Sequence, residues 1–229
     1  MNKQVTEVLK RSRYKVLTTG EELESVYRLR YNCYRAERSI AQNERGIMHD
    51  PFDDAENCLH VGVEIDGQLA ASVRLHLLSK LSHISPTLEV FPEVLDNLKR
   101  GQTALDSTRF VTAPSIRKQR VPLHFLALRI PFLATMFYDI DLALAAVRPE
   151  HTAFYRRYLG YDLVTEPRSF PLLEKPVQLL TANVREQRDA VLKRTPVFGP
   201  LDDIPQSNIA FPDMSGIYQA SRDGAAAAA

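Results

Sequence analysis

The first half of the chain combines short apolar segments of strand type with one segment of helical type. Residues 14–17, 59–65 and 69–78 are short and apolar, and an Asp-Gly pair joins the last two, which predicts a β-hairpin. Within residues 23–34, apolar side chains recur at helical spacing, and the threonines before them are typical N-caps. The first half therefore predicts a strand, a helix and a hairpin.

The second half predicts a parallel crossover. Residues 105–110 are built like a strand, residues 121–138 are apolar nearly all round, as in a helix that packs on a sheet, and residues 140–147 are typical of a strand buried on both faces. A short helix over 150–158 and a strand over 161–165 follow. Because such crossovers are right-handed, we expect an α/β fold with a central mixed, twisted sheet flanked by helices.

Polar and helix-breaking residues divide the chain into three parts. Residues 1–13 are polar, and we expect them to be flexible. Residues 14–198 form one domain, in which a strand over 177–181 and a helix over 182–193 make a C-terminal extension. Residues 199–229 are rich in Pro, Gly, Asp and Ala and end in a run of alanines, so we expect them to be disordered.

Composition narrows the class of protein. With 229 residues and 45% hydrophobic content, the chain can bury a core of ordinary size. Its 29 Lys and Arg residues balance 28 Asp and Glu residues, so the formal net charge of +1 gives no support for nucleic-acid binding. Cys33 and Cys58 lack metal-ligand spacing, which predicts buried thiols and no metal site. No apolar run approaches the roughly 18 residues of a membrane span, and the N-terminus is polar, so we expect a cytoplasmic protein without an integral membrane segment.

Charged residues interrupt several of the apolar segments. Arg30 lies on the apolar face of the first helix, and Arg74 interrupts the second strand of the hairpin. The loop 41–57 between them carries Asp50 and Asp53 among other acids. An arginine on an apolar face can extend its charge to solvent or pair locally, and an acidic loop can simply be solvated. The functional alternative is a cleft in which guanidinium groups meet an acid or a phosphate.

The strand over 105–110 carries an acid, two hydroxyls and an arginine. Alternation places Asp106 and Thr108 on one face and Arg109 on the other, unless a bulge breaks the alternation. A basic turn and a helix N-terminus follow, and together they offer backbone N–H groups and positive charge to a phosphate. The basic residues of this turn are Arg117, Lys118 and Arg120. A solvated turn is an equally good interpretation of that charge.

The succession of predicted elements resembles the GNAT acyltransferase fold, and residues 154–161, Phe-Tyr-Arg-Arg-Tyr-Leu-Gly-Tyr, resemble its late helix-to-strand junction. Charged motifs in this order also resemble the acyl-homoserine-lactone (autoinducer) synthases and the related long-chain N-acyl amino acid synthases, over about residues 14–166. These motifs are Leu29-Arg30, Asp50-Pro51-Phe52-Asp53, Arg74, Phe91-Pro92 and Asp106-Ser107-Thr108-Arg109-Phe110.

The resemblance implies an N-acyltransferase that moves a long-chain fatty acyl group from acyl carrier protein to the amine of a small acceptor, an amino acid. Asp106 stands where the family usually has glutamate, and it would accept the ammonium proton directly or through water. Tyr155 would protonate the departing thiolate, and the acyl chain would run between the 105–110 and 140–147 strands.

The resemblance also implies a role for each charged residue. The implied catalytic residues are Asp106, Arg109 and Tyr155, and the implied substrate-binding residues are Arg30, Asp50, Asp53, Arg74 and Phe110. Arg30 would take the acceptor carboxylate, while the two acids would pair with the other arginines. Arg117, Lys118 and Arg120 would dock the acidic carrier protein. A purely structural ion-pair network is the alternative for all of the buried charges.

Departures from the family pattern help to choose among relatives. The turn over 115–121 has no glycine, whereas acetyl-CoA-using GNAT enzymes typically wrap a glycine-bearing loop around the pyrophosphate, so carrier protein is favoured over acyl-CoA as the donor. The chain has no tryptophan, which autoinducer synthases typically carry after the first helix. Autoinducer synthesis from S-adenosylmethionine is therefore the second choice. The shortened acid at Asp106 leaves a third alternative, a non-catalytic carrier-protein or lipid binding module. No permanently bound cofactor and no metal are expected.

Overall fold

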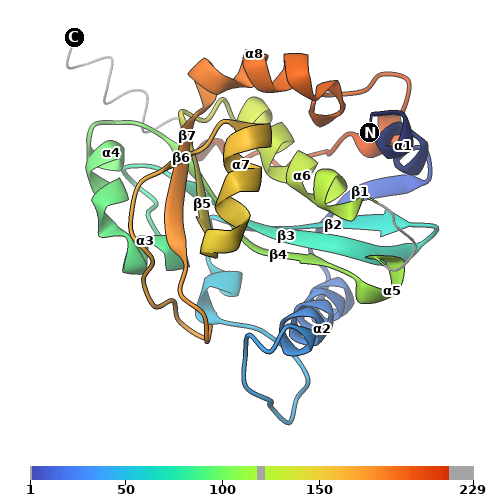
Figure 1. Ribbon diagram of the computed structural model, residues 1–229, viewed down its shortest axis with the longest axis horizontal. Helices are drawn as coiled ribbons and strands as arrows, with labels where there is room; N and C mark the ends of the chain where they lie inside the picture. Colours follow the sequence, from blue (N-terminus) through green and yellow to red (C-terminus); the bar gives the residue numbers. More distant parts are fainter. Residues whose placement is uncertain (1, 118–121, 217–229) are drawn as a thin grey trace.

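A twisted sheet of seven strands forms the centre of the part of the chain that the structure describes, residues 2–117 and 122–216 (Figure 1). The structure is a computed structural model. The strands are β1 (Ser12–Leu17), β2 (Cys58–Ile65), β3 (Gln68–Leu78), β4 (Ala104–Thr112), β5 (Leu142–Val147), β6 (Asp162–Leu163) and β7 (Gln178–Asn183). The helices are α1 (Asn2–Leu9), α2 (Gly20–Ala36), α3 (Pro86–Val90), α4 (Leu95–Lys99), α5 (Pro114–Arg117), α6 (Leu123–Phe137), α7 (Thr152–Leu159) and α8 (Val184–Arg194). The predicted α/β fold with a mixed sheet is confirmed.

The N-terminal half of the sheet is an antiparallel meander. β1 pairs with β2, β2 with β3, and β3 with β4. Asp66 and Gly67 form the turn of the predicted hairpin, and both have positive φ, 51° and 78°. α2 begins after Thr19, whose side chain and that of Glu22 form a capping box. This cap fixes the start of the helix that carries Arg30.

The sheet changes character between β4 and β5. These strands are parallel, but their pairing is limited to Ala104–Asp106 with Leu142–Leu144. β5 pairs along its whole length with antiparallel β7, so the order of the sheet is β1-β2-β3-β4-β5-β7-β6. α2 lies on one face of the sheet, and α6, α7 and α8 lie on the other (Figure 1). Backbone pairing between β4 and β5 therefore stops at Asp106, beneath α6.

The N-terminal residues are ordered, contrary to the expectation for residues 1–13. α1 begins at Asn2, and β1 begins at Ser12. Val5 and Leu9 are one helical turn apart and are 1% and 0% exposed, because they join the main core. Two apolar side chains at this spacing are enough to dock a polar helix on its neighbours.

The C-terminal expectation is also wrong as far as residue 216; residues 217–229 lie outside the described part. Residues 199–216 pack against the core, and Ile204 and Phe211 are buried in it. They are held by Arg129 of α6, which is fully buried. Its guanidinium donates hydrogen bonds to the carbonyl oxygens of Val197 (2.7 Å), Gly199 (2.8 Å) and Ser207. Backbone carbonyl groups therefore compensate a buried charge, a partnership that the composition of the segment does not reveal.

Candidate active site

A β-bulge in β4 brings Asp106 and Arg109 to one face of the sheet. Arg74 of β3 lies opposite Thr108 and Ser72 lies opposite Val111, so two residues of β4 face one residue of β3. Arg109 has a φ of 53°, a strained value for a long side chain. The bulge breaks the alternation, and Arg109 joins the face of Asp106 and Thr108. The expectation that alternation separates Asp106 from Arg109 is therefore corrected.

Two aspartates and three arginines form a buried charge network on this face. Arg30 Nη1 lies 2.6 Å from Asp53 Oδ1, and Arg74 Nη1 lies 2.8 Å from the same oxygen. Asp50 Oδ1 accepts from Arg74 Nη1 and Asp50 Oδ2 from Arg109 Nη2, both at 2.6 Å. Burial alone would raise the pKa of both carboxyl groups, but the arginines outweigh burial and hold both pKa values below the usual range. Both acids are therefore ionised at neutral pH.

The loop before β2 is folded so that it presents both acids. Asp50 caps the short 3-10 helix Pro51–Asp54, because its side chain accepts from the backbone N–H of Phe52 (3.1 Å). The Asp53 side chain completes a capping box, because it accepts a hydrogen bond from the backbone N–H of Asp50 at 2.8 Å. The network is thus attached to α2, β3 and β4 at once, through one turn of helix.

Two neutral histidines, His60 and His76, lie beside the charge network. His60 Nδ1 lies 3.0 Å from Arg30 Nη2, and His60 Nε2 lies 3.1 Å from the carbonyl oxygen of Asp53. A neutral ring that accepts at Nδ1 and donates at Nε2 satisfies both partners. Burial, with the neighbouring Arg30, lowers the pKa of His60 to about 4, and burial with Arg74 nearby lowers that of His76 to about 3. Both imidazoles are therefore neutral at physiological pH.

Arg30 has no place for a substrate carboxylate. It is 0% exposed, and both terminal nitrogens are used by Asp53 and His60. Arg74 is equally enclosed and Arg109 nearly so, and each of the three arginines keeps one donor without a hydrogen-bond partner among the described residues, namely Arg30 Nε, Arg74 Nη2 and Arg109 Nε. Because both terminal nitrogens of Arg30 are used, the structural interpretation of Arg30 is the better one, and Arg109, which is 5% exposed, is the better candidate for contact with a substrate.

Asp106 is enclosed beside the network. It is 0% exposed, Ser85 Oγ donates to its Oδ2 (2.7 Å) and Thr87 Oγ1 donates to its Oδ1 (2.8 Å). Ser85 is also the N-cap of α3. Burial raises the pKa of the Asp106 carboxyl to about 6, although the two hydroxyl groups oppose that shift. Asp106 therefore has the pKa of a group that can exchange a proton near neutral pH.

The buried titratable groups predict how stability depends on pH. The unfolded chain protonates His60 and His76 near pH 6.5, whereas the folded protein does so only near pH 4 and 3, so their contribution is complete above pH 6.5 and is lost as the pH falls. Asp106 acts in the opposite sense, because its pKa rises from 3.8 to about 6 on folding and its protonation stabilises the folded state.

As the pH falls from 6 to 4, the stability lost through the two histidines exceeds the stability gained through the one aspartate. We expect the free energy of unfolding to fall by about 1.4 kcal/mol per pH unit over this window, and by about twice that in Asp106→Asn. Urea unfolding at constant ionic strength measures both slopes. Identical slopes in the two proteins would show that Asp106 does not bind its proton in this range.

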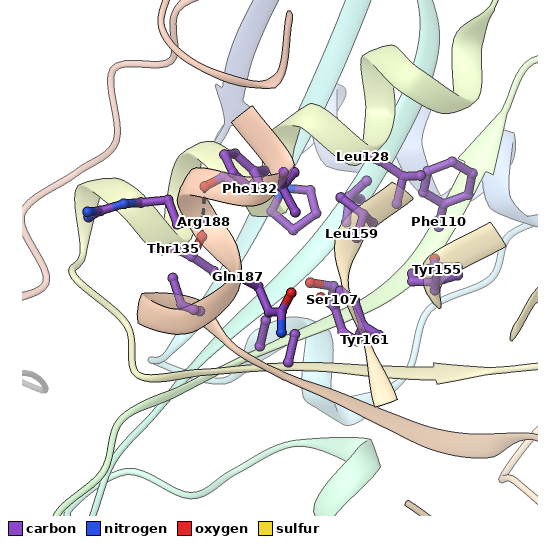
Figure 2. Close-up of a pocket in the computed structure, with 16 residues that line it drawn as sticks. Ser107, Phe110, Leu128, Phe132, Thr135, Tyr155, Leu159, Tyr161, Gln187 and Arg188 are labelled. Carbon is purple, nitrogen blue, oxygen red and sulfur yellow. Dashed lines mark hydrogen bonds between the residues drawn. The ribbon is translucent and has the colours of Figure 1, made fainter. Parts of the chain in front are cut away.

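A narrow cavity lies on the opposite face of β4, between that strand, α6, α7 and α8 (Figure 2). Its free volume is about 40 Å³. It is lined by Val73, Ser107, Phe110, Leu128, Pro131, Phe132, Thr135, Ala143, Tyr155, Leu159, Tyr161, Ala182, Val184, Gln187, Arg188 and Val191. Most of these side chains are apolar. The cavity thus occupies the region between β4 and β5 where the resemblance places an acyl chain.

The site residues expected from sequence fall into two groups. Phe110 and Tyr155 line the cavity, whereas Asp106 and the network lie on the other side of β4. Ser107, whose Oγ is buried and has no hydrogen-bond partner among the described residues, faces the cavity from β4. Lys118 and Arg120 lie outside the described residues, and the side chain of Arg117 is also not described.

Several residues of the site were not predicted. Ser85 and Thr87 precede and begin a short helix, and the Ser-Pro pair at its start is a detectable capping signal. The two histidines offered no signal, because a single histidine in an apolar strand has no characteristic spacing. Within residues 2–117 and 122–216, no cluster of histidine, cysteine and acidic residues could hold a metal ion. No helix in those ranges is long and apolar enough to cross a membrane.

The central sheet is mixed, and pairing stops between its two parallel strands. With a bulge in the first of these strands and a cavity beneath the crossover helix, this is the GNAT-like fold of the acyltransferases that the structure resembles. The family model described as "N-acyl amino acid synthase FeeM" matches residues 25–183. The chain therefore belongs to the FeeM family of N-acyl amino acid synthases.

Solved structures share the fold at low sequence identity. FeeM, an N-acyl amino acid synthase from uncultured soil microbes, is 14% identical with a TM-score of 0.66, over 80% of this chain and 96% of that chain. The CoA-dependent acyl-homoserine lactone synthase BjaI, with MTA, is 14% identical with a TM-score of 0.65, over 92% and 99%. MesI, also a CoA-dependent acyl-homoserine lactone synthase, is 20% identical with a TM-score of 0.61, over 87% and 100%. A comparison with curated protein sequences finds no significant match.

Proposed function

We propose that this enzyme moves a long-chain fatty acyl group from acyl carrier protein to the amine of an amino acid. The observation that carries the proposal is the apolar cavity beneath α6, next to the strand that bears Asp106. An acyl chain needs an apolar channel, and its thioester must end near a group that can take a proton. Membership of the FeeM family supports an amino acid as the acceptor.

The reaction begins when the amine, once deprotonated, attacks the thioester carbonyl. Asp106 accepts the ammonium proton directly or through water, because its pKa of about 6 makes it a base above that pH. Backbone N–H groups of β4 beyond Asp106 hold the oxyanion, since pairing with β5 has stopped there. The carbon–sulfur bond then breaks and the pantetheine leaves as a thiolate, which takes up the second proton that the nitrogen loses as the amide forms.

Tyr155 stabilises the leaving group. Burial raises the pKa of its hydroxyl above the usual value, so the group stays protonated. A tyrosinate is a stronger base than a thiolate, and Tyr155 therefore acts by donating a hydrogen bond and not by giving up its proton. This assignment modifies the role that the resemblance implies.

Arg109 is our candidate for the acceptor carboxylate. Its Nη2 pairs with Asp50, while its Nε keeps an unused donor, and the bulge turns the side chain to the face of Asp106. A guanidinium can hold two oxygen acceptors at once, as this site requires. The acceptor amine would then lie between Arg109 and Asp106.

A direct assay tests the proposal. The pure protein is incubated with a correctly loaded long-chain acyl carrier protein and a pool of amino acids, and N-acyl products are sought by mass spectrometry. Absence of product from every acceptor, with both acyl carrier protein and acyl-CoA as donors, contradicts the proposal. Product from acyl-CoA alone would reject carrier protein as the donor, an outcome that BjaI and MesI, described as CoA-dependent, make worth testing.

Autoinducer synthesis is the second candidate, because several structural relatives are acyl-homoserine lactone synthases. The same assay with S-adenosylmethionine as the sole acceptor discriminates the two reactions. Release of an acyl-homoserine lactone from S-adenosylmethionine supports the second candidate. An N-acyl amino acid formed only with the amino acid pool supports the first.

We further propose that the basic residues between β4 and α6 dock the carrier protein. Replacing Arg117, Lys118 and Arg120 together by glutamine should raise the donor KM at least tenfold and leave kcat nearly unchanged. The effect should shrink as salt is added, because the lost attraction is screened. Steady-state kinetics at two ionic strengths measures it. A reduced kcat at saturating donor would instead assign these residues to the chemical step.

A further inference from the structure

Two hollows meet between α7 and α8. The first is the enclosed cavity described above. The second is an open hollow of about 490 Å³ over the C-terminal end of α7, lined by Ala153, Arg156, Arg157, Gly160, Tyr161, Asp162 and Gln187. Tyr161 and Gln187 line both. These two side chains are therefore the partition between an apolar interior and a polar, solvent-filled space.

Gln187 is the part of this partition that can be removed without disturbing the core. Tyr161 is 7% exposed and belongs to the main core, whereas Gln187 stands on the half-exposed side of α8. Figure 2 shows its side chain projecting from α8 into the cavity. Truncation of a side chain on the half-exposed side of a helix costs little stability, whereas truncation of a tyrosine packed in the core costs several kcal/mol.

Gly160 explains how the glutamine reaches this position. It ends α7 with a φ of 69°, and a Cβ placed on it would lie 2.4 Å from Gln187 Oε1 and 2.9 Å from Gln187 Cδ. Gln187 therefore lies directly against the backbone of Gly160, where any other residue would displace it. The glycine therefore has two roles: it adopts the left-handed conformation that ends α7, and it leaves room for the Gln187 side chain.

We propose that Gln187 closes the acyl cavity where it meets the open hollow and sets the longest acyl chain that the enzyme accepts. The inference rests on the proposed function, because it assigns the cavity to an acyl chain. Without the glutamine, the cavity would continue into the open hollow beside Arg156 and Arg157. A longer chain would then pass its end into that hollow and no longer be compressed against the partition.

A binding experiment tests this role without any need for turnover. Saturated fatty acids of increasing length displace a fluorescent fatty acid probe from the wild-type protein and from Gln187→Ala. Wild-type affinity should rise about fourfold with each buried methylene and then fall once the chain meets the partition. In Gln187→Ala, which removes four heavy atoms, the turning point should move to chains longer by about three carbons.

Two control variants separate bulk from other causes. Gln187→Met keeps the length of the side chain and removes the amide, so it should keep the wild-type turning point. Asp189 lies on the same helix, is exposed and pairs only with its neighbour Arg188 among the described residues. Asp189→Ala should therefore leave the turning point unchanged. An unchanged turning point in Gln187→Ala overturns the proposal, as does a shift in Gln187→Met equal to that in Gln187→Ala.

The two proposals fail in different ways. If fatty acids bind with a turning point that Gln187→Ala moves, but no N-acyl product forms with any donor and acceptor, the proposed function fails and the partition stands. If product forms and the turning point is the same in both proteins, the partition fails alone. If no fatty acid of any length binds, the cavity does not hold an acyl chain and the partition is rejected.

Discussion

Asp106→Asn is expected to lower kcat by two to four orders of magnitude while the protein stays folded. Asparagine has the same shape: its amide oxygen can accept from one of the hydroxyl groups of Ser85 and Thr87, and its N–H can donate to the other once that hydroxyl rotates, so both buried hydroxyls keep a partner. What is lost is the proton acceptor. Single-turnover acyl transfer measures the effect, and thermal unfolding shows that the fold is retained.

The pH profile separates a base from a merely structural carboxylate. In the wild-type enzyme, kcat should rise with pH through an apparent pKa near the value of about 6 that burial produces in Asp106. In Ser85→Ala the profile should move to higher pH, because a hydrogen bond that favours the carboxylate is lost. Asp106→Glu keeps a carboxylate and should retain more activity than Asp106→Asn. Equal activity of the wild type and Asp106→Asn would exclude this residue from the chemistry.

Asp53→Ala is expected to cost about 3 to 5 kcal/mol of unfolding free energy, because it leaves buried guanidinium groups without their anion. Asp53 accepts from Arg30, from Arg74 and from the backbone N–H of Asp50. For a chain of this size the loss corresponds to a fall in Tm on the order of 10 °C. Urea unfolding gives the free energy directly.

Asp54 provides the matched control for this change. It is the next residue, its side chain is 70% exposed and it contacts only His49 among the described ion pairs. Asp54→Ala should therefore change stability by less than about 0.5 kcal/mol. If the two variants are equally stable, the network around Asp53 contributes nothing, and the arginines must be compensated elsewhere.

Much of the framework was predictable from local signals. The hairpin follows from an Asp-Gly turn between apolar strands, α2 follows from a threonine cap with helical spacing, and the parallel crossover follows from a long apolar helix between two strands. These signals involve residues that are close in sequence. The presence of buried charges was predictable too, since Arg30 and Arg74 interrupt apolar segments.

The pairing of those charges was not predictable. Three arginines compete for two aspartates, and the outcome depends on the bulge at Arg109 and on the short helix that presents Asp50 and Asp53. Alternation alone places Arg109 on the wrong face, and a helical wheel does not show that Arg30 is enclosed by Asp53 and His60. Such partners are set by the register between strands that lie far apart in sequence, which patterns within one segment do not encode.

The place of Arg129 has a consequence for the synthesis of the chain. Its partners Val197 and Ser207 follow it by 68 and 78 residues, so a ribosome-bound chain that already contains every strand of the sheet still lacks them. Until they emerge, α6 can pack on the sheet only by burying an uncompensated cation. Completion of the hydrophobic core must therefore wait until the segment that holds Val197 and Ser207 has emerged, so the sheet and α6 fold as one unit with that segment and not strand by strand.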